Sequence, residues 1–178
     1  TTAGGVSANR IAQWDGAAWS ALGSGMNSFV SALAVDAAGN LYAGGDFTTA
    51  GGVSADRIAR WDGSVWHTLG SGMNDGVYAL AVDGQGNLDA GGAFTTAGGV
   101  SANYIARWDG SAWHTLGSGM NDGVRALAVD GQGNLYAGGY FTTAGGVIAN
   151  GIARWDGSAW HALGSGMNDY VEALAVDG

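Results

Sequence analysis

Short apolar runs alternate with turn residues along the whole chain. Between residues 77 and 119 the runs are VYALAV at 77–82, LDAGGAF at 88–94, YIARW at 104–108 and AWHTL at 112–116. Such runs, bounded by glycine, asparagine and aspartate, are typical of strands joined by tight turns. The TTAGGV phrase between the second and third runs is predicted to be a loop. No run has the apolar spacing of a helix, so the pattern predicts four antiparallel strands.

The pattern recurs with a period of 47 residues. TTAGGV begins at Thr1, Thr48, Thr95 and Thr142, and the second and third copies differ at only six positions. The repeats are 1–47, 48–94, 95–141 and 142–178, the last lacking one strand, its second. Four antiparallel strands in a repeat of this length have the size of a propeller blade. We therefore expect residues 1–178 to form one all-β domain, a β-propeller of four-stranded antiparallel blades.

A glycine pair and two tryptophans recur in a fixed order. They are Gly44-Gly45, Trp61 and Trp66, then Gly91-Gly92, Trp108 and Trp113, then Gly138-Gly139, Trp155 and Trp160. This order resembles the kelch repeat and implies a kelch-like propeller with a role in interaction. Kelch blades usually carry tyrosine at the position of Trp61, and TTAGGV is not part of their pattern. The related galactose oxidase blades hold copper through a cysteine-modified tyrosine; this chain has no cysteine, so that activity is not expected.

The chain is ten residues short of four complete copies. The N-terminal end supplies the third and fourth strands of one shared blade, and the C-terminal end supplies its first strand. The second strand of that blade is missing. An unpaired strand edge favours association with another chain. We expect either a segment of a longer array or self-association of two or more copies to complete the ring. A self-contained ring of four blades stays open as an alternative, although it would be tight.

Composition and charge argue against nucleic acid as a partner and against insertion into a membrane. A formal net charge of −9, with six arginines and no lysine, repels a phosphate backbone, so nucleic acid is not expected. No apolar run reaches the roughly 20 residues needed to cross a bilayer, and no charged-then-apolar leader opens the chain. We expect no membrane insertion. An extracellular or cell-surface location is favoured, and a cytoplasmic one stays open.

Eight tryptophans supply bulk in a chain with 35 glycines. A tryptophan buried between blades removes about 150–250 Å² from water, which is worth several kcal/mol at about 25 cal/mol per Å². Strict repetition and apolar neighbours favour this packing role over the alternative, an aromatic platform for sugars.

Histidines and Asp-rich turns do not predict a catalytic centre. His67, His114 and His161 occupy one repeat position on separate predicted outer strands, so they cannot converge on one metal. The turn at 83–87 faintly resembles a calcium loop, but no glutamate follows at the required spacing. TTAGGV lacks the lysine and the following helix of a phosphate cradle. We expect no enzyme activity, no metal site and no cofactor.

The repeats differ most in chemistry at four positions. These are Arg10, Arg57, Tyr104 and Gly151; Phe29, Gly76, Gly123 and Tyr170; Ser31, Tyr78, Arg125 and Glu172; and Asp46, Ala93 and Tyr140. A milder difference is Tyr42, Asp89 and Tyr136. In an antiparallel blade the start of strand one, the end of strand two and the start of strand three share one edge, so the four positions are predicted to lie together. The opposite edge, made of the VDGQGN and WDGS turns, is nearly constant.

Variation confined to one edge of a constant scaffold favours a binding surface. Tyrosine and arginine, which recur there, commonly dominate binding energy. We predict recognition of a protein or glycan ligand, with binding candidates Arg10, Phe29, Ser31, Asp46, Arg57, Tyr78, Tyr104, Arg125, Tyr140, Tyr170 and Glu172. The alternatives are a structural or assembly module with neutral variation, and an enzyme with non-repeated polar groups converging in the channel.

Overall fold

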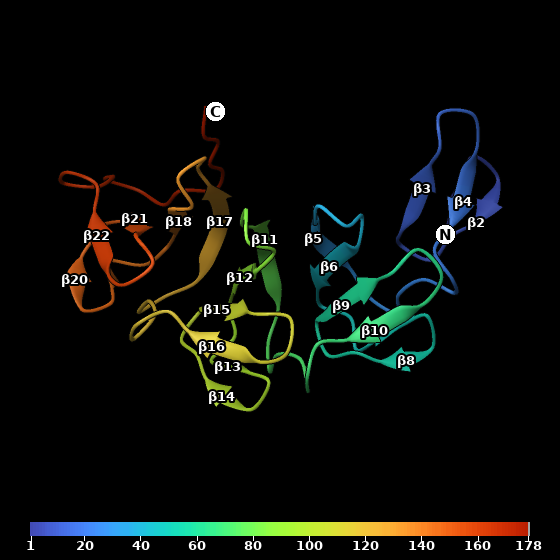
Figure 1. Ribbon diagram of the computed structural model, residues 1–178, viewed down its shortest axis with the longest axis horizontal. Helices are drawn as coiled ribbons and strands as arrows, with labels where there is room; N and C mark the ends of the chain where they lie inside the picture. The colour runs from blue at the N-terminus through green and yellow to red at the C-terminus, as the bar shows by residue number, and fades with distance from the viewer. Residues whose placement is uncertain (178) are drawn as a thin grey trace.

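The computed structural model describes residues 1–177, and its regular structure is entirely β (Figure 1). Within these residues there are three four-stranded antiparallel sheets. Sheet I contains β5 (Val30–Val35), β6 (Leu41–Gly45), β9 (Ile58–Trp61) and β10 (Trp66–Thr68). Sheet II contains β11 (Val77–Val82), β12 (Leu88–Gly92), β15 (Ile105–Trp108) and β16 (Trp113–Thr115). Sheet III contains β17 (Val124–Val129), β18 (Leu135–Gly139), β21 (Ile152–Trp155) and β22 (Trp160–Ala162).

The all-β prediction of four antiparallel strands per repeat is therefore confirmed. In each sheet the first strand pairs with the second, the second with the third and the third with the fourth. The first strands β5, β11 and β17 also contact one another in sequence, so the sheets follow in chain order around them (Figure 1). Before sheet I, β3 (Ala12–Trp14) and β4 (Trp19–Ala21) form a two-stranded sheet that corresponds to a third and fourth strand.

The TTAGGV phrase is a short β-hairpin, and its prediction as a loop was wrong. The hairpins are β1 (Thr2–Ala3) with β2 (Val6–Ser7), β7 (Thr49–Ala50) with β8 (Val53–Ser54), β13 (Thr96–Ala97) with β14 (Val100–Ser101), and β19 (Thr143–Ala144) with β20 (Val147–Ile148). In the third hairpin, Gly98 and Gly99 have φ of 57° and 83°. Positive φ at both turn residues is the geometry of a type I′ turn, which joins strands with the natural twist of a sheet. A Cβ at Gly98 would also lie 2.6 Å from the Trp113 ring.

Residues 171–177 repeat the sequence of a first strand but have no strand pairing. The segment nevertheless packs where a first strand would lie. Val171 N–H donates to Gly139 C=O at 3.2 Å, and a Cβ at Gly138 would lie 2.6 Å from Val171 Cγ1. Gly91 stands in nearly the same relation to Val124, at 2.5 Å. Glycine is thus required at this position because the next first strand approaches the backbone closely.

A β-bulge interrupts each pairing of a first with a second strand. The register shifts between residues 30 and 32, 77 and 79, and 124 and 126. The extra residue is Ser31 in β5, Tyr78 in β11 and Arg125 in β17. A bulge bends its strand and changes the direction of the extra side chain. One of the four variable positions is therefore the extra residue of the β-bulge.

Tryptophans of the fourth strands join each sheet to the repeat before it. Three indole N–H groups donate to main-chain carbonyls at 2.9 Å, pairing Trp66 with Leu22, Trp113 with Leu69 and Trp160 with Leu116. Each of these tryptophans is only 4% exposed and lies in a tilted pair, 5.4 Å between ring centroids, with the third-strand tryptophan of its own sheet. The ring thus combines apolar burial with a satisfied polar N–H, as buried tryptophan requires.

Residues that the inner repeats bury are exposed on the outward faces of the first and last repeats. Trp19 is 41% exposed, against 4% for Trp66, and Leu33 is 53% exposed, against 9% for Leu80. Met167 is 52% exposed, whereas its counterparts are 2–4% exposed. The sequences around these positions are nearly identical, so the difference comes from the neighbouring repeat. The prediction that all eight tryptophans pack between blades was wrong for Trp14 and Trp19, since both are exposed.

Candidate variable-edge binding site

Main-chain hydrogen bonds bring the variable positions to one edge of each sheet. In sheet II, Ala93 N–H donates to Gly76 C=O and Gly92 N–H donates to Tyr104 C=O, each at 3.0 Å. Equivalent bonds recur in sheets I and III. The start of the first strand, the end of the second and the start of the third therefore lie side by side. We call this edge the variable edge.

Arg125 lies between side chains of two sheets at the variable edge. Its guanidinium carbon is 4.4 Å from the centroid of the Tyr78 ring and 4.7 Å from that of the Tyr140 ring. Tyr78 and Arg125 are the bulged residues of adjacent first strands, and Tyr140 follows β18. Both distances are within the range of a cation–π interaction. Two sheets and the segment after β18 thus build one contiguous contact.

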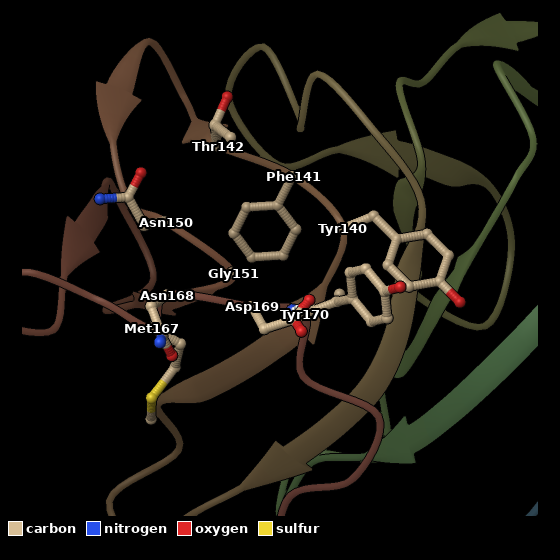
Figure 2. A pocket seen from close by; sticks show the side chains of 10 residues that line it. Tyr140, Phe141, Thr142, Asn150, Gly151, Met167, Asn168, Asp169 and Tyr170 are labelled. Carbon is tan, nitrogen blue, oxygen red and sulfur yellow. Dashed lines mark hydrogen bonds between the residues drawn. The ribbon is translucent and has the colours of Figure 1, made fainter.

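Tyr140 extends the contact to the last repeat. Its ring meets Tyr170 edge-on at 4.6 Å between centroids, and its hydroxyl donates to Glu172 Oε1 at 2.9 Å (Figure 2 shows the two rings side by side). The hydrogen bond to the Glu172 carboxylate, together with desolvation, raises the pKa of the Tyr140 hydroxyl. Tyr78, Arg125, Tyr140, Tyr170 and Glu172 form what we call the tyrosine–arginine cluster.

Asp46 lies beside this cluster. A Cβ at Gly76 would sit 2.6 Å from Asp46 Oδ1 and 2.8 Å from Tyr78 Cε1, so both side chains flank the same glycine. Glycine is the residue that fits between them. Of the eleven predicted binding residues, the cluster thus gathers five, and Asp46 borders it.

The other predicted residues share the edge but not the cluster. Arg57 pairs with Asp56 at 3.6 Å, Arg10 Nη1 donates to a main-chain carbonyl, and Phe29 is 72% exposed. Ser31 is the bulged residue of β5, and Tyr104 packs partly against the core. Among residues 1–177, no hydrogen bond, ion pair or cation–π contact joins any of these five side chains to the cluster.

Arg10, Arg57 and Tyr104 share a feature that sequence reasoning missed. Their φ values are 66°, 64° and 65°, and Gly151 at the same repeat position has 74°. Left-handed backbone is uncommon for residues other than glycine and costs free energy that the surrounding structure must offset. The signal was available in the sequence, because glycine occupies the position in one repeat.

A cavity of about 290 Å³ adjoins Tyr140 and Tyr170. It is lined also by Asn150, Met167 and Asn168 (Figure 2). In the inner repeats the next TTAGGV hairpin occupies the corresponding space. There Met120 bridges to Ala144, and the Asn121 side chain bonds to the main-chain N–H groups of residues 142 and 143. The cavity thus corresponds to a space that a hairpin fills in the inner repeats, and we assign it no ligand.

The histidines lie on the fourth strands, each paired with an aspartate of its own WDGS turn. His67 Nε2 lies 2.6 Å from Asp62 Oδ2, and the equivalent distances are 2.7 and 2.6 Å in the next two repeats. The hydrogen bond from His67 and those from the turn hold the pKa of the Asp62 carboxyl well below its usual range. Ser64 Oγ donates to Asp62 at 2.8 Å, not to the histidine, so the group lacks the connectivity of a Ser-His-Asp triad. In the described residues no three His, Asp or Glu side chains come together as a metal site would require.

Sheet II contains an ion pair that the sequence interpretation treated only as a mild difference. Arg107 Nε and Nη2 donate to the two carboxylate oxygens of Asp89, each at 2.8 Å, and Arg107 Nη1 lies 3.5 Å from Asp83 Oδ2. Asp89 is fully buried. Burial raises the pKa of Asp89, and Arg107 counteracts that rise. In the other two sheets a tyrosine at this position donates to the aspartate of the turn instead.

Comparisons with known proteins bear on the fold. No protein-family model matches the chain, and no curated protein matches it. Among solved structures, the extracellular domain of the putative one-component system BT4673 from B. thetaiotaomicron is similar, with a TM-score of 0.54 and 14% identity over 85% of this chain. A second structure, titled as the extracellular domain of the putative hybrid two-component system BT4673, has a TM-score of 0.55 and 12% identity over 87% of this chain. The chain spans about a fifth of each of those chains, 19% and 20%, and at these identities the likeness concerns the fold alone. No helix in residues 1–177 is long and apolar enough to cross a membrane.

Proposed function

We propose that the chain is a kelch-like propeller segment that recognises a protein or glycan ligand through its variable edge and does not catalyse a reaction. The observation that carries this proposal is the tyrosine–arginine cluster. Side chains that differ between repeats, and come from three of them, contact one another in one place. Neutral variation would not be expected to assemble tyrosine, arginine and glutamate into one contiguous group. The opposite edge, made of the near-constant VDGQGN and WDGS turns, belongs to the constant scaffold that such a site needs.

The first test removes the rings that flank Arg125. Tyr78→Ala and Tyr140→Ala are each expected to weaken binding of a ligand found on glycan and surface-protein panels by about 30-fold, the effect of losing an interface hot spot of roughly 2 kcal/mol. His114→Ala, on the outer strand of the same sheet as Tyr78, is the matched control and should leave affinity within about 2-fold. Affinity would be measured by surface plasmon resonance. A ligand whose affinity is unchanged by both tyrosine substitutions would contradict the proposal.

A second candidate function, an assembly module, is favoured by the exposed faces of the first and last repeats. Trp19 is 41% exposed where its counterparts are 4% exposed, and Leu163 is exposed where its counterparts are buried. These are the two halves of the interface that joins the inner repeats. The partner that fits them is another repeat of the same sequence, supplied either by a longer chain or by a second copy.

We expect the 178-residue chain to self-associate head to tail through these halves. Light scattering coupled to size exclusion should give a mass of at least two chains at about 100 µM. Trp19→Ala should shift the chain toward monomer, because it removes the main apolar group of one half, whereas Gln13→Ala on the neighbouring strand should not. A wild-type monomer throughout this concentration range would contradict self-association and leave the recognition proposal standing.

A further inference from the structure

β3 has a free main-chain edge. Within residues 1–177, β3 pairs with β4 alone, whereas the third strands β9, β15 and β21 each pair with a second strand as well. In sheet I, Gly45 N–H donates to Arg57 C=O at 2.9 Å. Main-chain groups alternate in direction along a strand, so Ala59, two residues after Arg57, also faces the second strand. Ala12 is the counterpart of Ala59, and in the described part of the chain its N–H and C=O have no strand partner on the edge away from β4.

A groove runs along this edge, between β3 and β5. Two adjoining cavities, of about 440 and 360 Å³, share Ile11, Ala12 and Leu33 in their linings. Val30 lines the first, and Val35 lines the second. Leu33 and Val35 are 53% and 62% exposed, so the groove offers apolar surface beside the unpaired main-chain groups. We call it the β3 groove.

The inner repeats show what fills the equivalent space. There a second strand lies between the third strand of its own sheet and the first strand of the next sheet. β6 pairs with β9 and contacts β11, and β12 pairs with β15 and contacts β17. Val77 and Leu80, the counterparts of Val30 and Leu33, are consequently 0% and 9% exposed. The occupant that fits the β3 groove is therefore an extended strand with the second-strand sequence of this repeat, Leu-X-Ala-Gly-Gly.

The first glycine of that sequence is required by the valine of the neighbouring first strand. A Cβ at Gly44 would lie 2.5 Å from Val77 Cγ1, and a Cβ at Gly91 would lie 2.5 Å from Val124 Cγ1. Val30 stands at the same repeat position in the β3 groove. A larger residue in the bound strand would overlap Val30, so the groove selects glycine there. The alanine before this glycine is fully buried in all three sheets, at Ala43, Ala90 and Ala137.

We propose that the β3 groove binds a Leu-X-Ala-Gly-Gly segment of a further repeat as an added strand of the β3–β4 sheet. The register follows β6 on β9, which places the segment's alanine opposite Ala12 and its first glycine opposite Ile11. Main-chain hydrogen bonds supply affinity, and the contact with Val30 supplies selectivity. The segment comes from a further repeat because β6, β12 and β18 are each already paired on both sides. This inference deepens the assembly function and rests on it.

The test uses the synthetic peptide NLYAGGDF, the sequence of residues 40–47, titrated into the 178-residue chain by isothermal calorimetry. The peptide is expected to bind. Gly44→Val in the peptide should weaken binding about 30-fold, because the added side chain overlaps Val30. Val30→Ala in the chain should recover most of that loss by making room, as contacting pairs do in a double-mutant cycle. Val53→Ala, in the β7–β8 hairpin outside the groove, is the matched control and should recover none.

A second peptide separates main-chain pairing from side-chain packing. Methylation of its alanine nitrogen keeps every side chain but removes the donor to the Ala12 carbonyl, and should weaken binding about 10-fold. Both modified peptides leave the protein unaltered, so folding of a variant does not affect their result. No binding of NLYAGGDF, or equal binding of the Gly44→Val peptide, would overturn the proposal.

The other proposals fail by different measurements. A chain that is monomeric in light scattering but binds NLYAGGDF with this selectivity would contradict self-association and support the β3 groove as a strand site. A chain that self-associates but does not bind the peptide would overturn the groove proposal alone. Tyr78→Ala, at the variable edge, should leave peptide affinity within about 2-fold, because it does not line the groove.

Discussion

Replacing Trp113 with alanine is expected to lower the free energy of unfolding by about 3–5 kcal/mol, the usual cost of truncating a large buried aromatic side chain. The ring is 4% exposed, packs against Trp108, and its Nε1–H bonds to the Leu69 carbonyl of the preceding repeat. Its loss leaves a cavity between two repeats and a buried carbonyl without its donor. Urea unfolding followed by circular dichroism would measure the change, with the midpoint and slope fitted separately.

Trp19→Ala is the matched control, because Trp19 occupies the same repeat position. Trp19 is 41% exposed and pairs only with Trp14 of its own two-stranded sheet. We expect its removal to cost the monomer, measured at a concentration too low for self-association, roughly 1 kcal/mol or less, in the range of partly exposed side chains. Equal losses for the two substitutions would show that contacts within a repeat, and not those between repeats, carry the stability of these tryptophans.

Asp89→Ala is expected to destabilise the protein by about 2–4 kcal/mol. Removing one partner of a buried ion pair leaves the other charge without compensation. Arg107 would retain only Asp83, at 3.5 Å, which keeps the expected loss below the upper end of the range for fully buried pairs. The same urea denaturation at neutral pH measures the change.

Asp89→Tyr should restore stability to the wild-type value or raise it by about 1 kcal/mol, as restoring a repeat consensus commonly does. Tyrosine is the residue at this position in the two sister sheets, where Tyr42 and Tyr136 donate to turn aspartates at 3.2 and 3.1 Å. Asp83 is the corresponding acceptor in sheet II. A tyrosine variant as unstable as the alanine variant would show that the Arg107 pair is specifically required by the packing of this sheet.

Much of the fold follows from local pattern. The run at 77–82 is the strand β11, and the third run corresponds to β15 once Tyr104 is removed, because its left-handed backbone cannot continue a strand. The TTAGGV hairpin was missed because its strands are only two residues long, too short for alternation to be visible. Its paired glycines, at positive φ in the structure, were nevertheless the residues of a primed turn.

Part of the candidate site could be predicted from the sequence. Comparing the repeats singles out Tyr78, Arg125 and Tyr140 as variable, and antiparallel geometry predicts that they share an edge. Comparison of repeats cannot show that Arg125 reaches both tyrosines, since that depends on bulges and on the spacing of adjacent first strands. Likewise the partner of Asp89 could not be predicted from the sequence. Sheets II and III both carry arginine at the position of Arg107, yet Arg107 donates to Asp89 whereas Arg154 donates to Asn134.

Periodicity and turn chemistry alone specify an all-β chain of repeated four-stranded units, since strand formation and tight turns depend on residues close together in sequence. Tertiary structure decides which identical residues are buried, as the contrast between Trp19 and Trp66 shows. It also decides which variable residues meet. Both outcomes depend on contacts between repeats, and a sequence period reports what each repeat contains but not what lies against it.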